Sequence, residues 1–295
     1  MTPVAFAFQA PRTVENALAL LSAASVPLAG GQSLVPLLSS RSTRPATVVD
    51  LNSLPELAGI RLAADTVEIG AMTRLRDVEH SAVLRDVLPV LPHAAADVAN
   101  RQIRHRGTVG GSLCHADPSA QLPAVVVALG GRLHLRSAGG ERVVPADAFF
   151  LAPHVTVRRP DELLTAVTIP LVPAMRFRFA AVSRRGEAGF PLISVCVGVS
   201  RDDPDAGHSA VVTAARLGAS GVAGRPLRLA TAEAALTGSR LTDTPDASLG
   251  AVLDGVAVDC EPPSDHRGGS TFRLDVLRTV IRREVIRLIS RRDEP

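Results

Sequence analysis

Apolar residues recur along the chain with two different spacings, and the two spacings alternate over its length. A repeat of roughly three or four residues predicts helices, and continuous or alternating apolar runs of about four to eight residues predict strands. Helices are predicted over residues 13–21, 73–79, 88–104, 118–129, 228–236, 249–256 and 271–290. Strands are predicted over residues 47–51, 67–71, 132–136, 163–169, 176–183, 192–199 and 211–217. Helices and strands mixed in this order indicate an α+β fold.

Local signals fix several of these elements. Thr13 is a suitable N-cap for the first helix, because its hydroxyl can accept from a free backbone N–H. The last helix is amphipathic, with arginines on one side. Its apolar face is predicted to carry Phe272, Val276, Val280, Val285 and Ile289. A boundary is expected at residues 170–173, which leaves a larger N-terminal part and a smaller C-terminal part.

Composition narrows the class of protein. The 295 residues are 46% hydrophobic and 21% charged, as in a soluble globular protein. All 32 basic residues are Arg, so a P-loop lysine, a Schiff-base lysine and a kinase lysine are excluded. A net charge of +3, with eight Phe and neither Tyr nor Trp, argues against nucleic-acid binding.

The location is predicted from the same sequence. The first residues lack a basic run followed by an apolar core, so we expect no signal peptide. The longest apolar stretch, residues 122–129, falls far short of the ~20 residues that span a bilayer. We therefore expect a cytoplasmic protein without a membrane span.

No pattern for metal binding or nucleophilic catalysis is visible. Cys114, Cys196 and Cys260 are far apart, which excludes a local zinc or iron–sulfur motif. The eight His show no metal-ligand spacing, and no Ser-His-Asp or Cys-His arrangement can be argued. We therefore expect no catalytic residue and no metal ligand in this chain.

Two Gly-Gly segments are the candidate binding elements. Tandem glycines lack the Cβ atoms that hold an anion away, and they permit φ > 0 conformations that turn successive N–H groups to one side. Each pair is also explained by a tight turn alone. Two such turns meeting at one place would hold a diphosphate without any lysine. The segments consist of Ala29, Gly30, Gly31, Gln32, Ser33 and Leu34, and of Thr108, Val109, Gly110, Gly111 and Ser112.

Longer stretches around these segments resemble one family. AGGQSLVPLL, IGAMTRLRDVEHS and NRQIRHRGTVGGSLCHADPSAQLPAVVVALGG are similar to the FAD-binding (medium) subunit of molybdenum hydroxylases. This family includes the flavoprotein subunits of carbon monoxide dehydrogenase and xanthine dehydrogenase. GASGVAGRPLRLATAEAAL and SDHRGGSTFRLDVLRTVIRREV resemble its C-terminal domain, so the similarity covers nearly the whole chain.

The resemblance implies a fold and domains. Residues 1–172 are expected to form a vanillyl-alcohol-oxidase (PCMH) type FAD-binding domain, whose two subdomains divide near residue 55. Residues 173–295 are expected to form a smaller α+β domain. In such a fold, backbone amides of two loops hold the diphosphate of a noncovalent FAD, and the two Gly-Gly segments match those loops.

The resemblance also implies further site residues. Leu163 and Leu164 match positions near the adenine, and Phe190 matches a position near the isoalloxazine ring. Cys114 is expected to pack beside the cofactor, and Asp117 to cap a helix or to contact the ribityl chain. The basic triplet 104–106 either complements the diphosphate or is a solvated helix end.

Departures from the family pattern concern two positions. Gln121 stands where many relatives have an acidic residue that contacts cofactor hydroxyls. Ala180, which precedes Arg184 and Arg185, stands where many relatives have a lysine. The inserted loop that holds a [4Fe–4S] cluster in some members is absent from this sequence.

The function implied is that of an oxidoreductase subunit for electron transfer. A large subunit would carry the molybdopterin cofactor and the substrate, and a small subunit two [2Fe–2S] clusters, in a heterotrimer or a dimer of heterotrimers. Electrons would pass from those clusters to FAD and on to an external acceptor. The alternatives are a self-sufficient FAD oxidase or dehydrogenase for a small molecule, and a non-catalytic subunit that has lost FAD.

Overall fold

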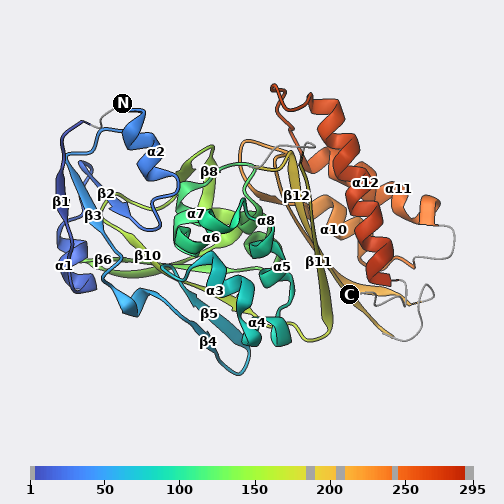
Figure 1. Ribbon diagram of the computed structural model, residues 1–295. Coiled ribbons are helices and arrows are strands. Elements are labelled where there is room, and N and C mark those ends of the chain that lie inside the picture. Colours follow the sequence, from blue (N-terminus) through green and yellow to red (C-terminus); the bar gives the residue numbers. More distant parts are fainter. Residues whose placement is uncertain (1–3, 184–189, 204–209, 241–244, 290–295) are drawn as a thin grey trace.

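The computed structural model describes residues 4–183, 190–203, 210–240 and 245–289. For residues 245–248 it describes the backbone but not the side chains. Three sheets lie side by side along the molecule, each built mainly from one part of the sequence (Figure 1). They give the α+β architecture that the sequence predicts. Arg184, Arg185 and the predicted last residue of the final helix, Ser290, lie outside the described residues.

The N-terminal sheet has three parallel strands in the order β1-β3-β2. Its elements are β1 (Ala7–Gln9), α1 (Val14–Ala19), β2 (Ser25–Leu28), α2 (Leu34–Ser39), β3 (Thr47–Asp50) and the short 3-10 helix η1 (Pro55–Leu57). The hydroxyl of Thr13 accepts from the N–H of Asn16, so Thr13 caps α1 as predicted.

The central sheet has five antiparallel strands in the order β4-β5-β10-β6-β7. They are β4 (Ile60–Leu62), β5 (Thr66–Gly70), β6 (Arg132–Ser137), β7 (Gly140–Pro145) and β10 (Leu163–Pro170). The neighbouring helices are α3 (Leu75–His80), α4 (Ala82–Val87), α5 (Val90–Ala96), α6 (Arg101–Arg106), α7 (Val109–His115), α8 (Gln121–Ala128) and α9 (Ala146–Phe149). A small hairpin of β8 (Phe150–Ala152) and β9 (Val155–Thr156) completes this part.

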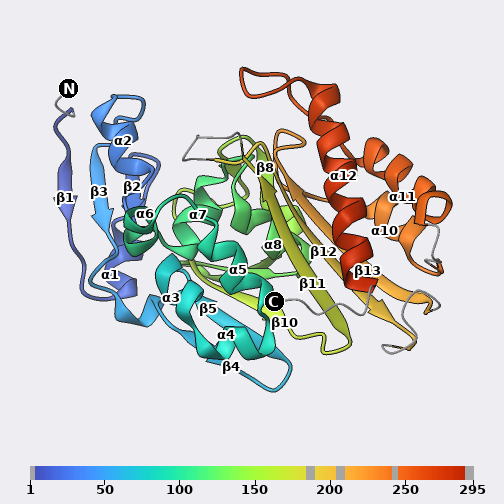
Figure 2. The same ribbon diagram turned by 45° about the vertical axis from the view of Figure 1, so that its right-hand side comes forward.

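The C-terminal sheet has four antiparallel strands in the order β11-β12-β13-β14. They are β11 (Met175–Val182), β12 (Ile193–Arg201), β13 (Val212–Ser220) and β14 (Leu227–Arg228). Two of the three C-terminal helices pack on this sheet, and the third packs against those two helices (Figure 2). These helices are α10 (Ala230–Leu236), α11 (Pro245–Asp259) and α12 (Ser270–Ile289).

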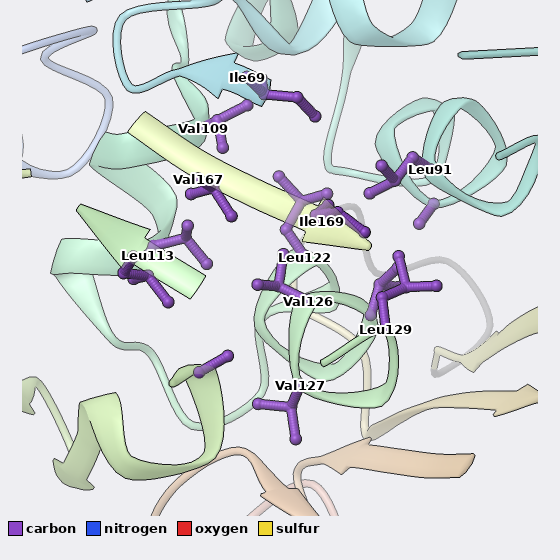
Figure 3. Packing of buried hydrophobic residues seen from close by; sticks show 14 of the residues in the cluster. Ile69, Leu91, Val109, Leu113, Leu122, Val126, Val127, Leu129, Val167 and Ile169 are labelled. Carbon is purple, nitrogen blue, oxygen red and sulfur yellow. The ribbon is translucent and has the colours of Figure 1, made fainter. Parts of the chain in front are cut away.

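Helix α8 lies between the central and C-terminal sheets, and every one of its residues is buried. Leu122 and Val126 lie on the side of β10, whereas Val127 points toward the C-terminal strands (Figure 3). On that side, the backbone of α8 lies against Gly218 of β13. A Cβ at Gly218 would lie only 2.2 Å from the carbonyl oxygen of Ala124. Glycine is therefore required at this position because α8 packs directly against the strand backbone.

Hydrogen bonds from the C-terminal sheet fix both ends of α8. The N–H of Gly221 donates to the carbonyl of Pro118, which lies before the helix, at 2.6 Å. Arg216 Nη1 donates to the carbonyl of Leu129, which ends the helix, at 2.9 Å. The segment that precedes α8 is thus positioned by residues about a hundred positions further along the chain.

Three local predictions were wrong. The single helix expected over residues 88–104 is divided into α5 and α6, because Ala99 adopts φ 45°. The second Gly-Gly segment is not a turn: Thr108 is the N-cap of α7, and Gly110 and Gly111 lie in its first turn. On the predicted apolar face of α12, Val280, Val285 and Ile289 are buried as expected, but Phe272 is 55% exposed.

The buried face of α12 includes two charged residues, which explains the last error. Arg273 is fully buried and donates to the carbonyls of Leu192 and Gly221. Glu284 is also buried and accepts from Arg178. An apolar pattern places only apolar side chains inside, so it did not predict that Arg273 and Glu284 are buried while Phe272 is exposed. Among the described residues, no helix is long and apolar enough to cross a membrane.

Gly218→Ala tests the contact between α8 and the C-terminal sheet. The added methyl group must displace the helix backbone, so the free energy of unfolding should fall by about 1–3 kcal/mol. The measurement is the midpoint of thermal unfolding. Gly250→Ala is the control, since a Cβ there meets no atom within 4 Å in α11, and its midpoint should stay or rise. Equal midpoints for the two variants would contradict this packing.

Candidate functional site

The first Gly-Gly segment connects the end of β2 to the start of α2, at the carboxyl edge of the parallel sheet. Gly31 has φ 76°, the left-handed conformation that glycine adopts without strain. A Cβ at Gly30 would lie only 2.1 Å from the carbonyl oxygen of Arg106. Glycine is therefore needed at each position for a different reason. Gly31 allows the chain to turn, and Gly30 allows the segment to pack against the backbone at the end of α6.

Backbone donors gather in this segment. Among the described residues, no oxygen accepts from the N–H groups of Gly31, Gln32, Ser33 or Leu34. The Ser33 hydroxyl makes no capping bond to α2 either. A hollow of about 340 Å³ adjoins these donors. It is lined by Leu28, Gly30, Gly31, Gln32, Val35, Pro36 and Arg106. Unpaired N–H groups beside a basic residue are suited to an anion.

The second Gly-Gly segment presents its backbone differently. The N–H groups of Val109 and Gly110 donate to the carbonyls of Thr73 and Ala71 at 3.0 and 2.8 Å. Those of Gly111 and Ser112 donate to the Oγ1 and the carbonyl of Thr108, both at 3.0 Å. These four amides are therefore already used inside the protein. The part-exposed Ser112 side chain remains as a donor from this segment.

Close packing accounts for the glycines of the second segment. A Cβ at Gly110 would lie 2.6 Å from the Cβ of Ala71, so α7 approaches the end of β5 more closely than alanine allows. A Cβ at Gly111 would lie 3.6 Å from the Cβ of Ala29. The two Gly-Gly segments are thus neighbours, as the sequence analysis expects.

Two residues that were not predicted link Ala29 of the first segment to Arg106, which lies two positions before the second segment. Arg74 donates from Nη1 to the carbonyl of Arg106 at 2.6 Å and from Nη2 to Asn52 Oδ1 at 2.7 Å. Asn52 Nδ2 in turn donates to the carbonyl of Ala29 at 3.0 Å. Burial and the nearby Arg106 lower the pKa of Arg74. The signal in the sequence was the position of Arg74 inside IGAMTRLRDVEHS.

The basic triplet 104–106 divides into two roles. Arg104 forms an ion pair with Glu79 at 2.8 Å, and this hydrogen bond lowers the pKa of Glu79. It also donates to the carbonyls of Val98 and Ala99. Arg106 instead lines the hollow beside Gly31. Its charge is therefore available to an anion, whereas that of Arg104 is used within the fold.

Two of the remaining candidates serve the fold in this structure. Cys114 packs against the central core, and burial raises the pKa of its thiol to about 11, so a nucleophilic thiolate is not formed near neutral pH. Gln121 is buried and donates from Nε2 to the carbonyl of Asp97 at 3.0 Å. Ala180 is half-buried on β11 and packs against the C-terminal core.

The four other candidates lie at four separate places. Leu163 and Met72 belong to one buried apolar cluster, and Ala29 packs against this cluster. Leu164 belongs to the central core. Phe190 is 48% exposed before β12. Asp117 Oδ1 accepts from the N–H and the hydroxyl of Ser119, while the N-cap of α8 is Ala120. Asp117 therefore orders the turn before the helix rather than capping it.

Comparison with known proteins identifies the family. Residues 4–172 match the FAD binding domain in molybdopterin dehydrogenase, and residues 178–288 match the CO dehydrogenase flavoprotein C-terminal domain. The chain belongs to the FAD-binding subunits of the molybdenum hydroxylases. It is therefore an oxidoreductase subunit whose cofactor is FAD, as the resemblance implies.

Relatives in this family share nearly its whole length. The glyceraldehyde dehydrogenase medium chain of Sulfolobus acidocaldarius is 31% identical over 95% of this chain and 97% of its own. Reconstituted CO dehydrogenase from Oligotropha carboxidovorans contains a chain that superposes with a TM-score of 0.91 at 30% identity, covering 99% and 100% of the two chains. Quinoline 2-oxidoreductase from Pseudomonas putida 86 gives 0.88 at 30% identity, with 98% of each chain covered.

Arg74→Met tests the connection between the two segments. Removing its two bonds frees the carbonyl of Arg106 and the side chain of Asn52, so FAD affinity should fall by roughly 10- to 100-fold, the worth of one or two charged hydrogen bonds. Affinity is measured by titrating flavin-free protein with FAD and following flavin fluorescence. Arg76→Met, at an exposed position of α3, the helix that Arg74 caps, is the control and should bind like the unmodified chain. Equal losses in both variants would contradict this role.

Proposed function

We propose that the chain holds a noncovalent FAD at the first Gly-Gly segment and serves as the electron-transfer subunit of a molybdenum hydroxylase. The observation that carries the proposal is the row of unpaired N–H groups from Gly31 to Leu34 beside Arg106. A diphosphate needs several donors and a positive charge, and this place offers both without a lysine.

Each residue has a stated task in this proposal. The amides of Gly31, Gln32 and Ser33 donate to diphosphate oxygens, and Arg106 balances their charge. The Ser112 hydroxyl adds a donor from the second segment. Leu163 would support the adenine side from within its apolar cluster, and Phe190 would contact the isoalloxazine ring.

The redox chemistry belongs to the cofactor. FAD, when bound, accepts and releases electrons, and the protein supplies binding and orientation. Within the described part of the chain, the thiol of Cys114 stays protonated near neutral pH and is no nucleophile. The sequence also offers no cluster-binding cysteine motif. We therefore infer that electrons enter from [2Fe–2S] clusters of a small subunit and leave to an external acceptor.

Substrate choice is assigned to another subunit. The three relatives are named for glyceraldehyde, carbon monoxide and quinoline, which share no chemistry that one flavoprotein pocket would recognise. A large molybdopterin-binding subunit would bind the substrate in a heterotrimer or a dimer of heterotrimers. The three free cysteines agree with a reducing compartment such as the cytoplasm.

The domain division is part of the same proposal. Residues 1–172 would form the FAD-binding domain, with its subdomains dividing near residue 55, and residues 173–295 the C-terminal domain. The change from the parallel sheet to the central sheet between β3 and β4 supports the first division. The start of the C-terminal sheet at Met175 supports the second.

Purification of the tagged chain from its native host tests the proposal. We expect it to bring two further polypeptides, molybdenum, one flavin per chain and roughly four iron atoms per flavin, the content of two [2Fe–2S] clusters. Acid precipitation should release the flavin, because no covalent bond holds it. The complex, and not the isolated chain, should bleach its flavin when substrate is added.

Other results would favour the alternative functions. A monomer that oxidises a small organic molecule at a physiological rate would establish a self-sufficient oxidase or dehydrogenase. A complex with molybdenum and iron but without flavin would establish a structural subunit. Either result contradicts the proposed function.

A further inference from the structure

Three potential metal ligands come together directly after α7. His115 is the last residue of α7, Asp117 lies in the segment that leads to α8, and His154 lies between β8 and β9. One ligand atom from each residue lies within 4.8 Å of the other two. The spacing in sequence did not reveal this group, because His154 follows His115 by 39 residues.

The backbone is bent at two places to bring these residues together. Ala116 and His154 have φ 49° and 59°, the left-handed region that residues other than glycine seldom adopt. The N–H of His154 donates to the carbonyl of Ala116 at 3.0 Å. Such strained positions persist only where surrounding contacts impose them, and they concentrate at functional sites.

Further hydrogen bonds orient the ligands. His154 Nδ1 donates to the carbonyl of His115 at 3.0 Å, which leaves Nε2 of that ring as the nitrogen with a free lone pair. Asp117 Oδ1 accepts from the N–H and hydroxyl of Ser119 at 2.9 and 2.8 Å, which leaves Oδ2 for another partner. Arg267 Nη1 supports Ser119 from the C-terminal part at 3.3 Å. Metal-binding histidines and carboxylates are held by bonds of this kind.

We propose that His115, Asp117 and His154 form a binding site for a divalent transition-metal cation such as Zn²⁺. Two imidazole nitrogens and one carboxylate oxygen are a donor set that Zn²⁺ accepts, with water as the fourth ligand. Ligand atoms bonded to one zinc ion lie about 3.4 Å apart, so the three side chains have to move together by roughly one ångström. The two imidazole rings already lie 4.7 Å apart between centroids, and His154 is exposed.

The ion would link two segments beside the flavin domain's second Gly-Gly segment. One is the turn from His115 to Ser119, which ends α7 and precedes α8, and the other is the β8–β9 hairpin. The site is separate from the first Gly-Gly segment and its hollow. The inference therefore does not rest on the proposed electron-transfer role.

Titration with Zn²⁺ and Co²⁺ tests the site in the full-length, flavin-loaded chain. Calorimetry should show one Zn²⁺ per chain, and Co²⁺ should give visible absorption bands of four-coordinate cobalt. His154→Asn keeps the left-handed backbone conformation, because asparagine tolerates it, and should weaken Zn²⁺ binding at least tenfold. Asp117→Asn should weaken binding as well.

His80→Asn is the matched control, since His80 is exposed on α3 and outside the cluster. It should bind Zn²⁺ like the unmodified chain. Absence of stoichiometric binding, or equal losses in His80→Asn and His154→Asn, would overturn the site. Flavin absorbance recorded in each sample shows that every variant is folded and loaded, so a failed titration is not confused with loss of the cofactor.

Discussion

The burial of α8 between two sheets is the constraint on which the rest of the molecule depends. The helix has no exposed face, and Gly218 lets its backbone rest on β13. Hydrogen bonds from Gly221 and Arg216 fix its two ends. The C-terminal sheet therefore does more than cover the FAD-binding part, because it determines where the segment between α7 and α8 lies. A change in the packing of the C-terminal part would be transmitted to Asp117.

The two Gly-Gly segments look alike in sequence but perform different physical tasks. At the first, Gly31 turns the chain and leaves a series of backbone donors unpaired. At the second, Gly110 brings α7 against Ala71, and the backbone donors are used within the protein. Arg74 and Asn52 link Ala29 of the first segment to the carbonyl of Arg106, just before the second. The first segment thus offers backbone donors to a ligand, whereas the donors of the second are used in packing and capping α7.

Sequence patterns predicted the features of the fold that neighbouring residues determine. They failed for features that depend on contacts between residues far apart in the sequence. The cap at Thr13 and the strand over residues 163–169 follow from neighbouring residues alone. The break at Ala99 does not, because Arg104 fixes it by donating to its carbonyl. The bond between Arg74 and Asn52 joins residues 22 positions apart, and no single-sequence pattern identifies such a pair. The family resemblance predicted the cofactor. That the backbone N–H groups of the two Gly-Gly segments are used differently is seen only in the structure.

Hydrogen–deuterium exchange of single amides, with and without FAD, tests this division of tasks most directly. The amides of Gly31, Gln32, Ser33 and Leu34 should exchange fast in the flavin-free chain and become strongly protected when FAD binds. Those of Val109–Ser112 should be protected in both states, because their acceptors lie within the protein. New protection at Val109–Ser112, with no change from Gly31 to Leu34, would contradict the account.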